Sequence, residues 1–308
     1  MSALSATLED YLVLRRSLGY KLARPGSVLT NFVGWLDCEG VDRITVGHAL
    51  AWATRSTEAS DRWRSTQLGM VRCFARYAQA VDPAHEVPPT WLLPSGGHRP
   101  APYLYSEAEV TALMLAAGGL ASPLRAATLG AVIGLLAVSG IRVGEALRLD
   151  RSDLDASVGA LIIRNSKAGK SRAVPLSAST VEALESYSAR RDELCPSPKT
   201  TAMFVSTTGT RWRSGNLNAA FDEVRDPAGV PPRRARCGPR LADMRHTFAV
   251  RTLIRWHREG IDVQAALPLL STYMGHVSPA STYWYFSASP ELLAAAARRV
   301  ENARGGRV

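Results

Sequence analysis

Apolar residues recur at intervals of three and four positions along the first 80 residues of the chain. At the start of the chain, Leu8, Tyr11, Leu12, Leu14 and Leu18 recur at helical spacing, and Gly19 offers a stop. Further helices are expected over residues 28–36, 46–54 and 60–80. The spacing therefore predicts a small helical bundle in the N-terminal part of the chain.

The helical pattern stops between residues 88 and 103. This stretch contains five prolines and two glycines, a density that cannot sustain a helix or a central strand. We therefore expect a linker over residues 88–103, with one domain over residues 1–87 and a second over residues 104–308.

Helical spacing resumes after this linker, and one hairpin interrupts it. Ser106 and Glu109 have the spacing of a capping box, and residues 126–138 are apolar on nearly every face, as in a buried helix. Apolar segments at residues 160–164 and 171–175 flank a basic tip, which predicts a β-hairpin. Other helices are expected over residues 143–149, 179–191, 216–225, 240–256, 263–274 and 290–303. The predicted fold class is mainly α with a small antiparallel β-sheet.

The chain is strongly basic, with a net charge of +10 and a pI of about 9.8. This excess favours an anionic partner, and nucleic acid is the commonest one, although a solvated basic surface is the plain alternative. Most of the basic residues are arginines, whose guanidinium fork binds two phosphate oxygens at once. The helix expected over residues 60–80 carries Arg62, Arg64, Arg72 and Arg76 on one face. We expect that face to contact DNA unless it is simply solvated.

Several classes of protein are disfavoured by the sequence. No apolar run reaches the roughly 20 residues that cross a bilayer, and no signal peptide is visible, so we expect a bacterial cytoplasmic protein with no membrane partner. Cys38, Cys73, Cys195 and Cys237 are scattered without the spacing of metal ligands, which predicts reduced thiols and no metal site. The chain also lacks a P-loop and a GxGxxG motif.

Three motifs in the expected second domain carry the candidate chemistry. The first is Ser-Gly-Ile-Arg-Val-Gly-Glu at residues 139–145, and the second is Asp-Met-Arg-His-Thr-Phe-Ala at residues 243–249. The third is Tyr-Met-Gly-His at residues 273–276, followed by Tyr-Trp-Tyr at residues 283–285. Each residue alone has an ordinary structural explanation. In this order and spacing, the motifs resemble the active site of the tyrosine recombinases, the phage integrase family.

This resemblance implies a fold and a reaction. The fold would be a helical, SAM-like core-binding domain that grips DNA, followed by an α+β catalytic domain. In the reaction, a tyrosine attacks a DNA phosphodiester, forms a 3′-phosphotyrosyl bond and releases a 5′-hydroxyl. A 5′-hydroxyl from another strand then attacks that bond and reseals the backbone. The covalent link conserves the energy of the phosphodiester, so the family needs no cofactor and no metal.

The resemblance also assigns roles to the conserved residue types. Arg142 and Arg245 would stabilise the negative charge of the pentacoordinate transition state. Lys167, at the tip of the expected hairpin, would protonate the leaving 5′-oxygen, with Lys170 as its rival. His276 would bind a phosphate oxygen, and Tyr285, nine residues later (285 − 276), would be the nucleophile.

Other residues would support these five. Tyr283 would lie on the opposite side of a helix from Tyr285, since successive residues are about 100° apart. Glu145 is three residues after Arg142 (145 − 142) and would orient the site by accepting hydrogen bonds. His246 would lie near Arg245 in a supporting place. Lys170 and Arg172, in and beside the hairpin tip, are expected to contact DNA.

The chain departs from the family pattern at Ala242. The family reads His-x-x-Arg here, whereas this chain reads Ala242-Asp243-Met244-Arg245. Losing one donor to a phosphate costs about 10²–10³ in rate, so we expect reduced activity. His246 lies about 100° round the helix from Arg245, which is a poor position for a substitute.

The resemblance predicts partners and leaves two alternatives open. Four protomers would act on two double-stranded DNA sites, with the helix expected at residues 290–303 packing on a neighbour, and sister recombinases of the same mobile element are possible companions. One alternative is an accessory DNA-binding subunit whose partner cuts the DNA. The other is a type IB topoisomerase, which shares the chemistry but relaxes supercoils without pairing sites.

Overall fold

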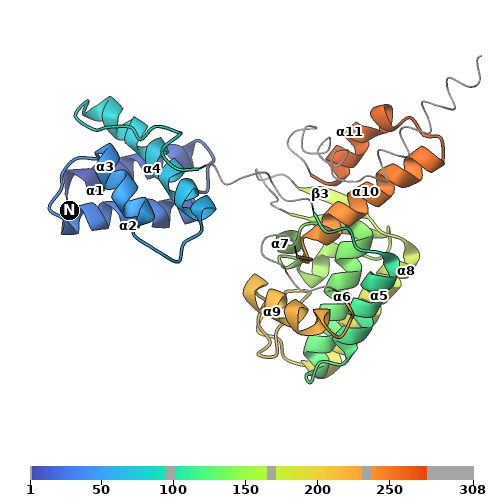
Figure 1. The fold of residues 1–308 in the computed structure, drawn as a ribbon. Helices are drawn as coiled ribbons and strands as arrows, with labels where there is room; N and C mark the ends of the chain where they lie inside the picture. Colours follow the sequence, from blue (N-terminus) through green and yellow to red (C-terminus); the bar gives the residue numbers. More distant parts are fainter. Residues whose placement is uncertain (1, 95–101, 165–170, 231–237, 276–308) are drawn as a thin grey trace, which may run out of the picture. The chain divides into compact units, whose positions relative to one another are not determined.

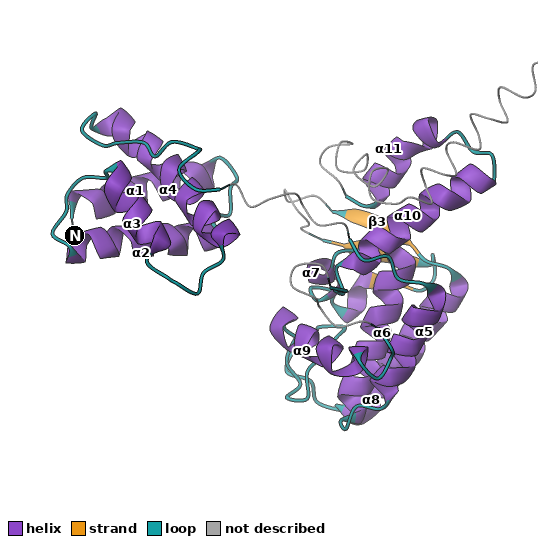
Figure 2. Cartoon of the chain, viewed as in Figure 1, coloured by secondary structure: helices purple, strands orange, loops and turns teal. Residues whose placement is uncertain are grey.

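The computed structural model describes residues 2–94, 102–164, 171–230 and 238–275. The chain divides into two compact units, residues 1–99 and residues 100–308. Figure 1 colours both units along the sequence, and Figure 2 shows how small the sheet is beside the helices. The expected fold class, mainly α with a small antiparallel sheet, is confirmed.

The N-terminal unit is a bundle of four helices in its described part. The helices are α1 (Ala3–Ser17), α2 (Ala23–Cys38), α3 (Val46–Thr54) and α4 (Asp61–Val81). Ser2, Thr45 and Ser60 accept hydrogen bonds from the first turns of α1, α3 and α4, and so cap them. Phe32, Trp52 and other fully buried side chains fill the space between the helices.

The expected linker is partly attached to this bundle. Val87, Leu92 and Leu93 pack against its core. The carbonyl oxygens of Pro88 and Pro89 accept hydrogen bonds from Arg72, at 2.6 and 2.7 Å. The segment that we expected to begin the linker therefore runs along the N-terminal unit.

The second unit has a helical layer with a small sheet beside it. Its elements are α5 (Glu107–Gly118), α6 (Pro123–Ser139), α7 (Val143–Ala146), a 3-10 helix (Arg151–Asp153), β1 (Leu154–Asp155), β2 (Ala160–Ile163), β3 (Arg172–Pro175), α8 (Ala178–Leu194), α9 (Ser214–Arg225), α10 (Asp243–Arg258) and α11 (Val263–Tyr273). The central helix α6 packs against α5, α8 and α10. It contains the expected buried run, and Leu129, Val132 and Ile133 are fully buried. This helix therefore forms the core from which the motif at residues 139–145 emerges.

The sheet has three antiparallel strands in the order β1-β2-β3. In the hairpin, Leu161 pairs with Val174 and Ile163 pairs with Arg172. The short β1 was not predicted, because two residues are too few to show an alternating pattern. Arg172 is the first residue of β3, where it pairs with Ile163.

Two helices differ from their expected bounds. α7 ends at Ala146 rather than residue 149, and the carbonyl groups of Leu147 and Leu149 beyond it accept hydrogen bonds from Arg211. α10 begins at Asp243 rather than residue 240. The turn before it is closed by the Asp243 N–H, which donates to the Arg240 carbonyl, and by the Asp243 carboxylate, which accepts from the Arg240 N–H.

Tyr105, near the start of the second unit, fixes the position of α10. The backbone N–H of Tyr105 donates to Thr247 Oγ1 at 3.0 Å, and its hydroxyl donates to the Arg240 carbonyl at 3.0 Å. Arg251 in turn donates to the Tyr105 carbonyl. These three bonds attach Tyr105 to residues on both sides of Arg245 along α10 and the turn before it.

Candidate active site

Arg142 lies at the point where the chain leaves α6 and enters α7. Its backbone N–H donates to Glu145 Oε2 at 3.0 Å, and its Nη1 donates to Glu145 Oε1 at 2.7 Å. Its Nη2 donates to the carbonyl oxygen of Gly275 at 3.0 Å. The side chain is 31% exposed. Arg142 is therefore held on two sides while part of its guanidinium stays accessible.

Arg245 lies on the first turn of α10 and is 8% exposed. Its Nη1 donates to the carbonyl of Gly140 at 2.8 Å, and its Nη2 donates to the carbonyl of Met274 at 2.5 Å. Gly140 has φ +60°, and a Cβ there would lie 2.4 Å from the Phe248 ring. A glycine is thus required for the end of α6 to approach α10 this closely.

Arg172, on β3, belongs to the same cluster, and its side chain is 12% exposed. Its Nη1 and Nη2 donate to Glu145 Oε1 and Oε2, at 3.2 and 2.9 Å, and its Nε donates to the Tyr273 carbonyl at 2.7 Å. We expected Arg172 to contact DNA, but the structure turns it inward. No local pattern indicates this pairing, because Glu145 is 27 residues away in the chain (172 − 145).

Glu145 is the acidic centre of the cluster, with its side chain 1% exposed. Burial opposes its ionisation, but hydrogen bonds from Arg172 and Arg142 outweigh burial and lower its pKa from 4.5 to about 2. Its two oxygens accept hydrogen bonds from both arginines. Three guanidinium groups and one carboxylate leave two excess positive charges (3 − 1) in the cluster.

The departure from the family pattern lies at the start of α10. Ala242 is exposed at the residue that precedes the helix. Asp243 is buried, and its two oxygens accept from Nε and Nη2 of Arg240 at 3.1 and 2.7 Å. His246 is half-buried, next to Arg245 in the sequence. A larger side chain at position 242 would therefore extend toward solvent and need no repacking.

The structure does not describe four of the predicted site residues. Lys167 and Lys170 lie outside the described residues, as do His276 and Tyr285 with its neighbour Tyr283. The described chain ends at Gly275, whose carbonyl is bonded to Arg142. Arg142 and Arg245 are thus brought together on the residues that directly precede His276 in the sequence.

The arginine face of α4 separates into two pairs. Arg64 donates to the carbonyl groups of Ser56 and Thr57, at 2.8 and 3.0 Å, and Arg72 holds the prolines described above. Arg62 and Arg76 are exposed. Among the described residues, then, Arg62 and Arg76 are the members of this face left to meet a partner.

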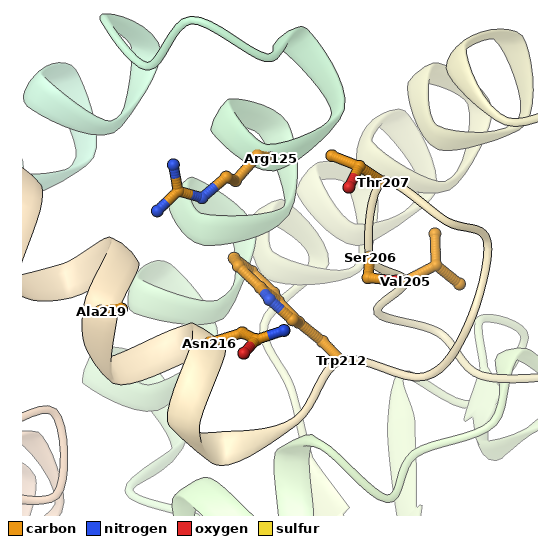
Figure 3. A pocket seen from close by; sticks show the side chains of 7 residues that line it. All are labelled: Arg125, Val205, Ser206, Thr207, Trp212, Asn216 and Ala219. Atoms are coloured by element: carbon orange, nitrogen blue, oxygen red, sulfur yellow. The ribbon is translucent and has the colours of Figure 1, made fainter.

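A hollow of about 270 Å³ lies apart from the arginine cluster, between the start of α6, residues 205–207 and α9. Figure 3 shows Trp212 between Arg125 of α6 and Asn216 of α9. Arg125 is bonded to Glu223 at 2.7 Å. Beside it, the loop before α9 presents several hydroxyl groups and Arg213, which is exposed. Sequence reasoning did not select this surface, although Thr207, Thr208 and Thr210 so close to Arg211 and Arg213 were a visible signal.

Two negative results apply to the described part of the chain. None of its helices is long and apolar enough to cross a bilayer. Within the same residues, no group of three or more His, Cys, Asp or Glu side chains could hold a metal ion. The described Cys38, Cys73 and Cys195 are free thiols.

Several known proteins are similar to this chain in sequence. The family model "Phage integrase family" matches residues 105–291. A protein named as an integrase/recombinase, y4rB of Sinorhizobium fredii (strain NBRC 101917 / NGR234), is 41% identical, covering 98% of each chain. A second one from the same strain, y4rE, is 37% identical, covering 96% of this chain and 95% of its own.

Solved structures show the same fold at low identity. The Tn1549 transposon integrase in complex with transposon right end DNA has a TM-score of 0.64 at 15% identity, covering 96% of this chain and 98% of its own. A lambda integrase dimer bound to a COC′ core site has a TM-score of 0.61 at 17% identity, covering 93% and 96%. With the family match and the 41% identical relative, these findings show that the chain belongs to the tyrosine recombinase (phage integrase) family.

Proposed function

We propose that this protein is a site-specific DNA recombinase that cuts and rejoins double-stranded DNA through a 3′-phosphotyrosyl intermediate. The observation that carries the proposal is the arginine cluster. Arg142 and Arg245 lie on separate helices, yet they donate to the carbonyl groups of the adjacent residues Gly275 and Met274. Two excess positive charges, rigidly held, suit the charge that gathers on a phosphodiester during displacement.

The reaction assigns a step to each residue. The Tyr285 hydroxyl loses its proton to solvent and its oxygen attacks the phosphorus, while Arg142 and Arg245 bind the non-bridging oxygens and the bond to the 5′-oxygen breaks. Lys167, with Lys170 as the alternative, donates a proton to that 5′-oxygen, and His276 binds a phosphate oxygen. In the second half, a 5′-hydroxyl returns its proton to the lysine and attacks the phosphorus of the phosphotyrosine. The bond to the Tyr285 oxygen breaks, and that oxygen takes up a proton from solvent. The number of phosphodiester bonds is conserved.

The relatives support a role in moving or integrating a DNA element. Two proteins at 41% and 37% identity bear integrase/recombinase names, and both occur in one strain. That co-occurrence supports sister recombinases acting in one cell. We propose that protomers assemble on two DNA sites, through the chain segment over residues 290–303.

Ala242 sets the expected rate. The exposed methyl group offers no hydrogen bond where the family has a histidine, so cleavage is expected to be about 10²–10³ slower than with a donor present. The remaining arginine pair keeps the site capable of chemistry. A slow cutting enzyme is therefore proposed in preference to an accessory subunit.

Covalent trapping tests the proposal. The protein is mixed with nicked suicide duplexes from DNA flanking its own gene, and SDS-resistant adducts are counted. We expect an adduct with the wild type and with Tyr283→Phe, and none with Tyr285→Phe. Tight, salt-sensitive DNA binding with no adduct from any duplex would instead favour the accessory subunit. Relaxation of supercoils with no sequence preference would favour the topoisomerase.

A further inference from the structure

We infer that Arg172 is a positioning residue that locks β3, α7 and the last turn of α11 into one unit, and that it does not contact DNA. The inference rests on the proposed function, because it assigns the role of a residue around that active site. It replaces the DNA contact that the position of Arg172 beside a basic hairpin tip suggested.

Arg172 already donates several hydrogen bonds within the protein. Three of its nitrogens donate to three acceptors, two of them the oxygens of one carboxylate at 3.2 and 2.9 Å. The third acceptor is the Tyr273 carbonyl at the end of α11. This is the paired fork geometry of a strong arginine–carboxylate contact. These bonds engage Nε, Nη1 and Nη2 of Arg172, so a phosphate contact would have to share nitrogens that already donate to the protein.

Arg172 and Arg142 share one acceptor, the Glu145 carboxylate. Both Glu145 oxygens accept from both arginines, since Arg142 donates through its backbone N–H and Nη1. Fixing the Glu145 carboxylate from the Arg172 side therefore also fixes Arg142. Removal of Arg172 would leave a buried carboxylate with one guanidinium partner and free to rotate toward it.

Gly275, in the turn after α11, packs closely against the Arg172 guanidinium. Gly275 has φ +64°, and a Cβ there would lie 2.8 Å from Nη1 and 3.0 Å from Cζ of Arg172. Since the same Gly275 carbonyl accepts from Arg142, the turn is clamped between the two arginines. Glycine is thus needed both for the backbone conformation and for the guanidinium beneath it.

Together these contacts hold two described residues, Arg172 and Gly275, that are close in sequence to Lys167 and His276. Lys167 precedes Arg172 by five residues (172 − 167), and His276 directly follows Gly275. Arg172 therefore anchors the hairpin and the α11 turn against the same carboxylate. Lysine cannot replace it, because one ammonium group cannot span both Glu145 oxygens and the Tyr273 carbonyl.

The test separates binding from cleavage. For Arg172→Ala and Arg172→Lys, DNA affinity is measured across a salt series, and the rate of adduct formation is measured at saturating protein. We expect the slope of log affinity against log salt to stay unchanged, and the saturated rate to fall more than about tenfold for both variants. A slope smaller by about one, with an unchanged saturated rate, is the signature of a phosphate contact and would overturn the inference.

A double-mutant cycle gives a readout that needs no activity. Gly275→Ala is made in the wild type and in Arg172→Ala, and thermal unfolding is followed. Because the added methyl group meets the guanidinium, Gly275→Ala should lower Tm in the wild type by at least about 4 °C, and by less than half as much once Arg172 is truncated. Equal shifts in both backgrounds would contradict the clamp.

Two controls keep the outcomes apart. If the wild type forms no adduct, the proposed function fails, whereas the unfolding cycle still tests the clamp. If Arg172→Ala does not fold, Gly275→Ala alone is used. We expect it to slow the saturated cleavage rate with the salt slope intact, and an unchanged rate would again contradict the inference.

Discussion

At the scale of single residues, Glu145 makes the free energy of unfolding depend on pH. Its folded-state pKa of about 2 lies below its ordinary value of 4.5, so the ionised form contributes stability that is fully present above pH 4.5 and is lost as the pH falls toward 2. The shift corresponds to about 3 kcal/mol at pH 7. Urea unfolding of Glu145→Gln should show this loss at pH 7 and a flatter decline between pH 4.5 and 2.

The exposed Glu182 on α8 provides a matched control for removing one carboxylate. Glu182→Gln should keep the wild-type decline in the free energy of unfolding. If Glu145→Gln also keeps it, the carboxylate does not hold the cluster together in the way its contacts indicate.

Ala242 allows a gain of function to be predicted. Its position is exposed, so Ala242→His should leave Tm within about 1 °C and speed single-turnover cleavage by about 10²-fold, because a phosphate donor is restored. Ala242→Leu, which adds bulk without a donor, should leave the rate unchanged. A Tyr285-dependent adduct whose rate does not respond to histidine would show that this enzyme works without the donor.

Sequence reasoning selected Arg142 and Arg245 because their motifs are local. It also placed Glu145 on the same turn as Arg142, since three residues separate them. The inward role of Arg172 was out of reach, because it depends on a contact with Glu145 that the fold brings together across α7 and the sheet. A basic residue beside a basic turn is typical of a phosphate contact, and nothing local distinguishes the two roles.

At the scale of elements, α4 carries two kinds of arginine. Some donate hydrogen bonds to other parts of the chain, and others are exposed. Arg72 donates two hydrogen bonds to the carbonyl groups of Pro88 and Pro89, so Arg72→Ala should lower the free energy of unfolding by about 1–3 kcal/mol. The exposed Arg76 is its matched control on the same helix. Arg76→Ala should leave stability within about 0.5 kcal/mol and weaken DNA binding instead. The reverse pattern in unfolding and binding assays would contradict this division.

The loop before α9 predicts a second phosphate contact. Arg213 is exposed beside the hydroxyl groups of Thr208 and Thr210, at the start of a helix whose first N–H groups receive no side-chain cap. Arginine, hydroxyl groups and helix N-termini are frequent phosphate donors. Arg213→Ala should reduce the salt slope of DNA binding by about one. Arg190→Ala on α8, where the side chain pairs with Glu193, should not change it.

Periodicity predicted most of the described helices, because a buried face imposes a period of 3.6 wherever the helix is long. It failed at element ends, where side chains from elsewhere decide. Arg211 donates to two carbonyl groups just beyond the end of α7, and Asp243 closes a turn with Arg240 just before the start of α10. Neither partner can be found from the periodicity of the helix that it changes.

At the scale of the whole molecule, the two units have separate hydrophobic cores, which predicts that each folds alone. If both contact DNA, joining them makes the second contact intramolecular. The intact chain should therefore bind a target duplex about 10²–10⁴ times more tightly than residues 1–99 or residues 100–308 by themselves. The salt slopes of the two pieces should add up to that of the intact chain, because each slope counts neutralised phosphates. Fluorescence anisotropy with one duplex and three proteins measures all of these values.

Arg62→Ala with Arg76→Ala in the intact chain should reproduce part of the loss. If residues 100–308 bind as tightly as the whole chain, the N-terminal unit is not a DNA-binding unit, and its exposed arginines are solvated as the plain alternative holds.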